Sequence, residues 1–280
     1  MPEQGCSGNE CAPIVAAATA TPSPAVTLTA EPEDPPLVPV YAAAVIEAHC
    51  GATLYALNEE YRLAPASLVK MMTAIVALER TEADEIVEID FDVAGLSLAA
   101  DATAMGLRPG DRLPLVDLIY GLLLRSAHDA AIVIAEHVAG DEAAFVSLMN
   151  EKAAELGLAD TRFANVSGLD HPDQWMSARD AAILGEELLG VPLLAEVVAT
   201  REYQPAWTRG PIENLNLLLN HFSGSVGVKT GFTEDAGQTI VAAADRDDRL
   251  LITSVLHSED LYVDAAALLD WAFANTVPAC

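Results

Sequence analysis

The chain has 280 residues, 52% of them hydrophobic, and its 42 acidic and 14 basic residues give a formal net charge of −28. This length and apolar content are enough for a large core, in one domain or in two closely merged domains. So acidic a chain should repel nucleic acid and anionic lipid surfaces, which excludes both as general partners. The carboxylates are expected to form a solvated surface.

Residues 1–38 are rich in Ala, Pro and Thr, and we expect a flexible tether there. No signal peptide is visible, because the first basic residue is Arg62 and prolines interrupt the apolar stretch. No apolar run is long enough for a transmembrane segment. Either a signal was removed, or the start is truncated, or the protein stays inside. A proline-rich tether ahead of a domain is common in exported proteins, which favours the first two.

The four cysteines do not form a recognisable metal motif. Cys6, Cys11, Cys50 and Cys280 include no Cys-x-x-Cys pair and have no histidine at metal-ligand spacing. Cys6 and Cys11 could close a small disulfide loop if the protein is exported, but nothing in the sequence fixes that pairing. A zinc site is therefore not expected.

The folded region is predicted to begin with a β-hairpin, whose strands are residues 40–48 and 52–57. An apolar helix is expected over residues 66–80, followed by a short strand at 85–89. Residues 101–115 have the composition of a loop with a short strand, and they contain a Pro-Gly-Asp turn at 109–111.

Four helices are predicted in the middle of the chain. The first covers residues 116–124, where apolar side chains recur at helical spacing. Asp129 is expected to cap a second helix that ends at Gly140, and Asp141 a third. Ser177 opens a fourth helix, which runs to residue 190.

The last third of the chain returns to strands. Strands are predicted at residues 225–229, 238–244 and 249–257, and a final helix at 259–275. An order of strands, helices, strands and helix indicates an α+β fold. We expect one domain over residues 39–280, with an antiparallel sheet built from about 39–65 and 222–280 and an all-helical block inserted between them.

Ser67 and Lys70 lie three positions apart at the start of the apolar helix, so their side chains should be neighbours. A buried lysine can lose its proton and then take one from a serine hydroxyl, which makes a nucleophile and its base. Ser-x-x-Lys alone is a weak signal, which an ordinary buried helix with a Ser and a Lys at its start explains better. The chain has only three lysines, however, and two of them, Lys70 and Lys229, fall in candidate motifs.

The other two motifs are Ser126-Ala127-His128 and Lys229-Thr230-Gly231. In order and spacing, the Ser-x-x-Lys and Lys-Thr-Gly motifs resemble those of penicillin-binding proteins and serine β-lactamases. The flanking sequence, including residues 65–74, 122–140 and 228–237, is more similar to one branch, the low-molecular-weight serine D-alanyl-D-alanine carboxypeptidases. The resemblance covers roughly residues 40–275.

This resemblance implies a β-lactamase/DD-peptidase-like fold, an extracytoplasmic location and a peptidase that needs no metal or organic cofactor. Ser67 would attack the carbonyl between the two terminal D-alanines of a peptidoglycan stem peptide, and β-lactams would acylate the same serine. Lys70 would take the serine proton, with Ser126 as the third catalytic side chain.

The resemblance also implies the substrate contacts. Lys229 and Thr230 would hold the terminal carboxylate, and Gly231 would let the substrate backbone lie against the strand. The backbone N–H groups of Ser67 and Phe232 would form the oxyanion hole.

His128 departs from the family pattern, which normally has Asn at this position. Imidazole can still donate or accept a hydrogen bond, so His128 is assigned to substrate binding, and it can carry charge near pH 6.5. Two alternatives stay open. One is a catalytically weakened protein that binds peptidoglycan or penicillin. The other is a serine β-lactamase, although the helical block has no Glu-x-x-x-Asn segment for deacylation.

Overall fold

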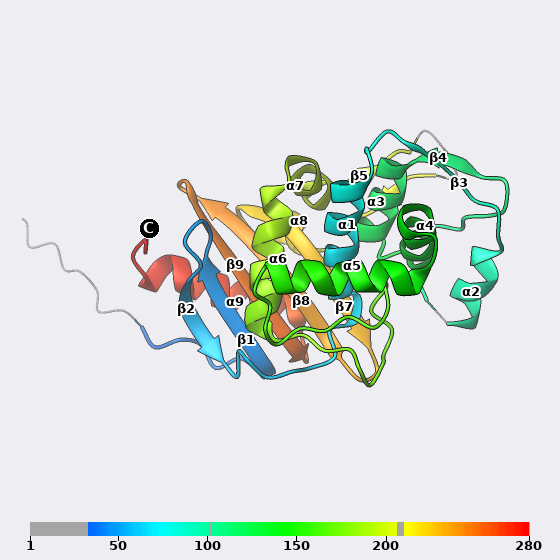
Figure 1. The fold of residues 1–280 in the computed structure, drawn as a ribbon. Helices are drawn as coiled ribbons and strands as arrows, with labels where there is room; N and C mark the ends of the chain where they lie inside the picture. The colour runs from blue at the N-terminus through cyan, green and yellow to red at the C-terminus, as the bar shows by residue number, and fades with distance from the viewer. Residues whose placement is uncertain (1–32, 101, 206–209, 280) are drawn as a thin grey trace, which may run out of the picture. The chain divides into compact units, whose positions relative to one another are not determined.

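The computed structural model describes residues 33–100, 102–205 and 210–279. Its main feature is a five-stranded antiparallel sheet with the strand order β2-β1-β9-β8-β7 (Figure 1). The strands are β1 (Val40–Glu47), β2 (Ala52–Leu57), β7 (Ser225–Thr233), β8 (Gly237–Arg246) and β9 (Arg249–Ser258). The sheet therefore joins the early part of the chain to its end, as the predicted α+β arrangement requires.

Both faces of the sheet are covered, and the side chains of β1 alternate between them. Ala42, Ala44 and Ile46 belong to the core cluster under the helical block, whereas Ala43 and Val45 pack with α9 (Leu261–Asn275). Successive residues of a strand point to opposite faces, so a strand covered on both sides is apolar throughout. This explains the uninterrupted apolar run in β1.

The helical block is built around α1 (Val69–Arg80), whose residues 69–77 are all buried. Neighbouring helices α3, α4, α5 and α6 all contact it. The other helices of the block are α3 (Leu115–Leu124), α4 (His128–Ala139), α5 (Glu142–Glu155), α6 (Ala178–Gly190) and α7 (Pro192–Ala199). Asp141 and Ser177 cap α5 and α6 as predicted, by accepting from the N–H groups of residues 144 and 180.

Smaller elements complete the described chain. They are the helices α2 (Val93–Ala99) and α8 (Leu218–His221) and the two-stranded pairs β3 (Ile86–Glu88) with β4 (Arg112–Pro114) and β5 (Glu202–Tyr203) with β6 (Ile212–Glu213). Helix α2 was not predicted from the sequence. Asp92 caps it by accepting from Gly95 N at 3.1 Å.

The prediction that Asp129 caps a helix was wrong. Helix α4 begins at His128, and its N-cap position, Ala127, makes no side-chain cap. The Asp129 carboxylate accepts one bond from the first turn of α4, from Ala130 N at 2.9 Å, and three from the backbone N–H groups of residues 105, 106 and 107, at 3.0, 2.8 and 3.0 Å. The loop before β4 supplies more donors than the helix terminus does, so these hydrogen bonds hold the loop beside the Ser126–His128 motif.

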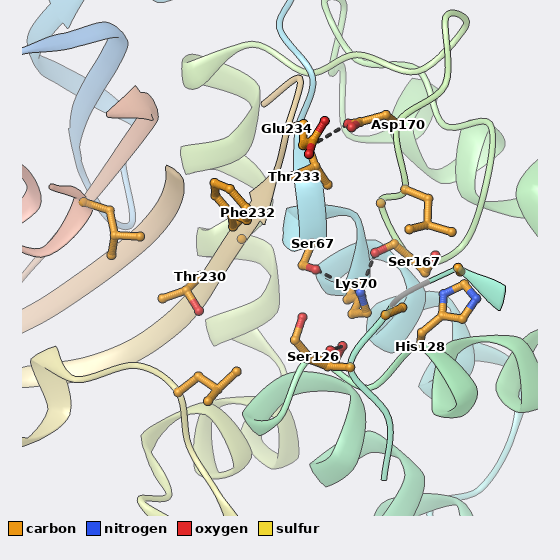
Figure 2. A pocket seen from close by; sticks show the side chains of 18 of the residues that line it. Ser67, Lys70, Ser126, His128, Ser167, Asp170, Thr230, Phe232, Thr233 and Glu234 are labelled. Atoms are coloured by element: carbon orange, nitrogen blue, oxygen red, sulfur yellow. Dashed lines mark hydrogen bonds between the residues drawn. The ribbon is translucent and has the colours of Figure 1, made fainter. Parts of the chain in front are cut away.

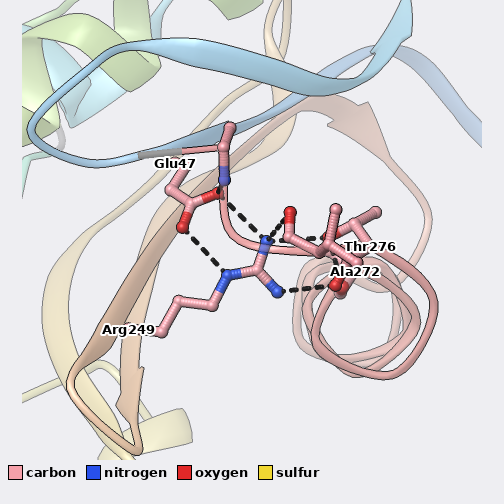
Figure 3. Close-up of polar contacts among 6 residues, drawn as sticks. Glu47, Arg249, Ala272 and Thr276 are labelled. Carbon is pink, nitrogen blue, oxygen red and sulfur yellow. Dashed lines mark hydrogen bonds and ion pairs between the residues drawn. The ribbon is translucent and has the colours of Figure 1, made fainter.

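A buried ion pair joins β1 to β9 and to the residues that follow α9 (Figure 3). The Glu47 carboxylate accepts from Arg249 Nε at 3.0 Å and from Arg249 Nη2 at 3.1 Å. The same guanidinium donates to the Thr276 carbonyl at 3.0 Å. The hydrogen bond from Arg249 lowers the pKa of Glu47. Because both charges are paired, their burial is tolerated.

The end of the expected tether contacts the folded region. Glu33 N donates to Asn275 Oδ1 at 2.7 Å, and Trp271 Nε1 donates to the Glu33 carbonyl at 2.8 Å, so this segment is tied to α9. The rest of the tether, residues 1–32, lies outside the described residues, as do the other three cysteines. Cys50 is disulfide-bonded. In the described part of the chain, no helix is long and apolar enough to cross a membrane.

Candidate active site

Ser67 lies in a tight turn, the 3-10 helix η1 (Ala66–Leu68), immediately before α1. Ala66 has a φ of +50°, in the left-handed region that non-glycine residues seldom adopt. Two glycines let other segments approach this turn closely. A Cβ on Gly168 would lie 1.9 Å from the Ala66 carbonyl oxygen, and one on Gly231 would lie 2.8 Å from Ser67 N. The turn is thus held between the 165–170 loop and β7.

Lys70 reaches back from α1 to the serine. Its Nζ lies 2.9 Å from Ser67 Oγ and donates to the Ser167 carbonyl at 2.5 Å (Figure 2). The lysine is only 3% exposed. Burial, and then the charge of Lys229, hold the pKa of Lys70 well below its ordinary value. An amine in this state can act as the base for the serine hydroxyl.

Lys229 of β7 is buried and does not belong to the cavity lining. It is 1% exposed, its Nζ donates to the Thr230 carbonyl at 2.7 Å, and burial lowers its pKa to about 7. Direct contact of Lys229 with a substrate carboxylate therefore stays a prediction. The structure does place its charge close enough to influence Lys70.

The motif Ser126-Ala127-His128 forms another wall of the site, across from β7. Ser126 has a φ of +62°, and its carbonyl accepts from Thr103 Oγ1 at 2.7 Å, while His128 N donates to the Thr103 carbonyl at 2.8 Å. Burial and then the charge of Lys70 lower the pKa of His128, against an opposite effect of Asp129. The imidazole is consequently neutral at neutral pH, and its charging moves below the pH 6.5 expected from the sequence.

These elements enclose a cavity of about 720 Å³. Its lining includes all the site residues predicted from the sequence except Lys229: Ser67, Lys70, Ser126, His128, Thr230, Gly231 and Phe232. The Phe232 side chain is 67% exposed at the cavity edge. Within the described ranges, no cluster of three or more His, Cys, Asp or Glu side chains could hold a metal ion.

The 165–170 loop contributes to the site but was not predicted from the sequence. Asn165 Oδ1 accepts from the N–H groups of Ser167 and Gly168, and Asp170 Oδ1 accepts from Thr233 Oγ1 at 2.6 Å. These bonds fix the loop against β7, with the Ser167 carbonyl on Lys70. The contact with Lys70 is made by the backbone carbonyl of Ser167, so the side chains of the loop do not indicate it in the sequence. The only available signal was Asn165 ahead of Gly168, which is typical of an Asx turn.

The fold and this arrangement define a class of proteins. The crystal structure of the Streptomyces K15 DD-transpeptidase superposes with a TM-score of 0.83 at 28% sequence identity, covering 86% of this chain and 100% of that one. The fold is therefore β-lactamase/DD-peptidase-like, as predicted.

The family follows from the sequence comparisons. The family model for D-alanyl-D-alanine carboxypeptidases matches residues 29–260, and the chain belongs to this family. The D-alanyl-D-alanine carboxypeptidase DacC of Escherichia coli is 36% identical over 77% of this chain and 56% of its own length. DacF of Bacillus subtilis is 32% identical over 83% of this chain and 62% of its own. The chain thus spans less than two thirds of the length of these relatives.

Proposed function

We propose that this protein is a serine D-alanyl-D-alanine carboxypeptidase that trims peptidoglycan stem peptides on the outer side of the cytoplasmic membrane. The observation that carries the proposal is the 2.9 Å separation between Lys70 Nζ and Ser67 Oγ, with the lysine buried and its pKa lowered. Family membership supports the same activity.

Acylation begins when Ser67 Oγ attacks the carbonyl carbon between the two D-alanines and Lys70 takes the hydroxyl proton. The N–H groups of Ser67 and Phe232 stabilise the oxyanion that forms. Collapse of this intermediate breaks the peptide bond, and the leaving amine takes a proton passed from Lys70 through Ser126. D-Alanine departs and the remaining peptide stays esterified to Ser67.

Deacylation follows the same path with water as the nucleophile. Lys70 takes a proton from the water, the water oxygen adds to the ester carbonyl, and Ser67 leaves with the proton returned to it. Thr230 and the charge of Lys229 hold the substrate carboxylate, and His128 contributes a hydrogen bond as a neutral imidazole. β-Lactams acylate Ser67 by the same step.

The test is D-alanine release from a peptide that ends in D-Ala-D-Ala, with Ser67→Ala as the control. We expect release from the parent protein and none from the variant. Labelled penicillin separates the alternatives, because a β-lactamase would turn the adduct over in seconds. A weakened binding protein would be labelled without releasing D-alanine, and His128→Asn would then raise its activity sharply. Absence of both labelling and release would contradict the proposal.

The pH dependence tests the coupling between the two lysines. Lys70 must be neutral to take the serine proton, so kcat/KM should fall as the pH drops through its pKa. Because the charge of Lys229 helps to hold that pKa down, a Lys229→Met variant should lose activity at a higher pH than the parent. If the acidic limb of the pH–rate profile were the same in Lys229→Met as in the parent, the coupling would be contradicted. Lys152→Met is the control for the loss of a remote lysine.

A further inference from the structure

Three exposed rings lie together where β1 begins and β9 ends. The centroid of the Tyr41 ring is 5.7 Å from that of Tyr61 and 6.5 Å from that of His257, and both contacts are edge-to-face. Tyr41 is 46% exposed, Tyr61 is 56% exposed, and His257 is exposed as well. We call these three residues the aromatic platform. Single exposed aromatic side chains are ordinary, but a contiguous group of them is typical of a binding surface.

A stack of two arginines on an indole begins at Arg62, the residue after the second tyrosine of the platform. The Arg62 guanidinium carbon lies 5.4 Å from the centre of the Trp175 ring, and that of Arg162 lies 5.6 Å from it. Two backbone hydrogen bonds between residues 63 and 176, of 3.1 and 2.9 Å, hold the two segments together. Both arginines are exposed, so guanidinium N–H donors lie next to the platform.

The charges around this surface favour an uncharged polymer as its ligand. Arg62 is paired with Asp160 at 3.0 Å, and Glu59 and Glu60 directly precede the second platform tyrosine. The whole chain has a net charge of −28, so it repels a polyanion. A pyranose ring has C–H groups on its faces and hydroxyl or acetamido groups on its edges. Exposed aromatic rings beside N–H donors match both features of such a sugar.

The aromatic platform lies beside the turn between β7 and β8, toward which the N-terminal part of a bound peptide would extend. His257 Nδ1 is 3.1 Å from the carbonyl oxygen of Ala236, in that turn. Figure 2 shows Thr230 and Glu234 on opposite sides of Phe232. Thr230 is assigned to the terminal carboxylate and Phe232 N to the scissile carbonyl. The residues that precede the scissile bond therefore extend along β7 toward the turn.

The length of a stem peptide fits this placement. Beyond Phe232, strand β7 continues only to Thr233 before the turn begins. A stem pentapeptide extends by roughly 10 Å ahead of its D-Ala-D-Ala pair. Its attachment to the sugar therefore lies past the turn, on the side of the platform.

We propose that the aromatic platform and the adjoining arginine–tryptophan stack bind the glycan strand to which the stem peptide is attached. The rings of Tyr41 and Tyr61 contact the faces of N-acetylated pyranose units, and the guanidinium groups donate to their hydroxyl and acetamido oxygens. This inference rests on the proposed carboxypeptidase function. It adds a preference for stem peptides that are still attached to glycan over free peptides.

The first test uses a sugar without peptide, so its result does not depend on catalysis. Chitohexaose, an oligomer of N-acetylglucosamine, is titrated into the protein and followed by calorimetry or NMR. We expect the parent to bind it at least about tenfold more tightly than the double variant Tyr41→Ser/Tyr61→Ser. Tyr61→Phe keeps the ring face and should bind like the parent. So should Ile86→Ser, the control, which replaces a side chain of β3 that is 50% exposed.

The second test compares D-alanine release from a free stem pentapeptide and from the same pentapeptide on an un-cross-linked glycan strand. We expect the parent to prefer the glycan-linked substrate by roughly tenfold in kcat/KM. In Tyr41→Ser/Tyr61→Ser this ratio should fall to about 2 or below, while the rate on the free peptide stays unchanged. Ile86→Ser should keep the preference of the parent.

The two tests separate this inference from the proposed function. Equal affinities of the parent and the double variant for chitohexaose, or tighter binding of polyphosphate than of chitohexaose, would overturn the glycan site alone. Equal rates of the parent on the two substrates would do the same. Release from neither substrate, by a protein that still binds chitohexaose, would overturn the proposed function and leave the sugar site standing.

Discussion

A Lys70→Met variant should release D-alanine roughly 10²- to 10⁴-fold more slowly than the parent, the usual contribution of a positioned general base. Methionine fills a similar volume, but it cannot take the proton of Ser67, which lies 2.9 Å from Lys70 Nζ. The variant should also be at least as stable as the parent, because an amine that is 3% exposed is replaced by an apolar side chain. Steady-state kinetics and thermal unfolding measure the two effects.

The matched control is Lys152→Met, which removes a lysine from the same small set of three. Lys152 pairs with Glu79 at 2.5 Å, and that ion pair raises its pKa, so its loss should cost stability and leave turnover per folded molecule unchanged. If Lys70→Met kept more than a tenth of the parent activity, the role of Lys70 as the base would be wrong.

A Gly168→Ala variant should lose at least about 10²-fold in activity, because a displacement of about 1 Å at the nucleophile has an effect of that size. The added Cβ would lie 1.9 Å from the Ala66 carbonyl oxygen and 2.9 Å from Ser67 N, so the turn or the loop must move. The same movement would withdraw the Ser167 carbonyl from Lys70. Acylation rates with labelled penicillin report this loss directly.

Gly168 also has a φ of +88°, so an alanine there is strained whatever the space around it. Gly140→Ala separates strain from collision, because Gly140 has a φ of +83° with nothing within 4 Å of an added Cβ. That control should be destabilised by about 1 kcal/mol and remain fully active per folded molecule. Equal activities of the two variants would show that the close approach of the 165–170 loop does not position Ser67.

The sequence predicted the elements in which side-chain identity determines the structure. Strand β1 is apolar on both faces, and Asp141 and Ser177 are cap residues without a competing partner. The strand was expected to end at Lys229, ahead of a Thr-Gly-Phe segment, whereas the structure continues β7 to Thr233. This extension places residues 230–232 in the cavity wall beside Ser67.

The sequence could not predict contacts made by the backbone. Every residue has a backbone carbonyl, whatever its side chain. Only the folded loop therefore shows that the carbonyl of Ser167 contacts Lys70. Asp129 illustrates a related difficulty: its position fits a helix cap, and only the tertiary structure brings the N–H groups of residues 105–107 to its carboxylate. The burial of Lys229 likewise depends on packing from distant segments.

The position of the covalent adduct that penicillin forms tests most directly whether Ser67 is the nucleophile. The protein is treated with penicillin, digested, and mapped by mass spectrometry. We expect one adduct, on Ser67, which forms in the parent and is absent from Ser67→Ala. An adduct on Ser126, or no adduct in a folded protein, would contradict the assignment of Ser67 as the nucleophile.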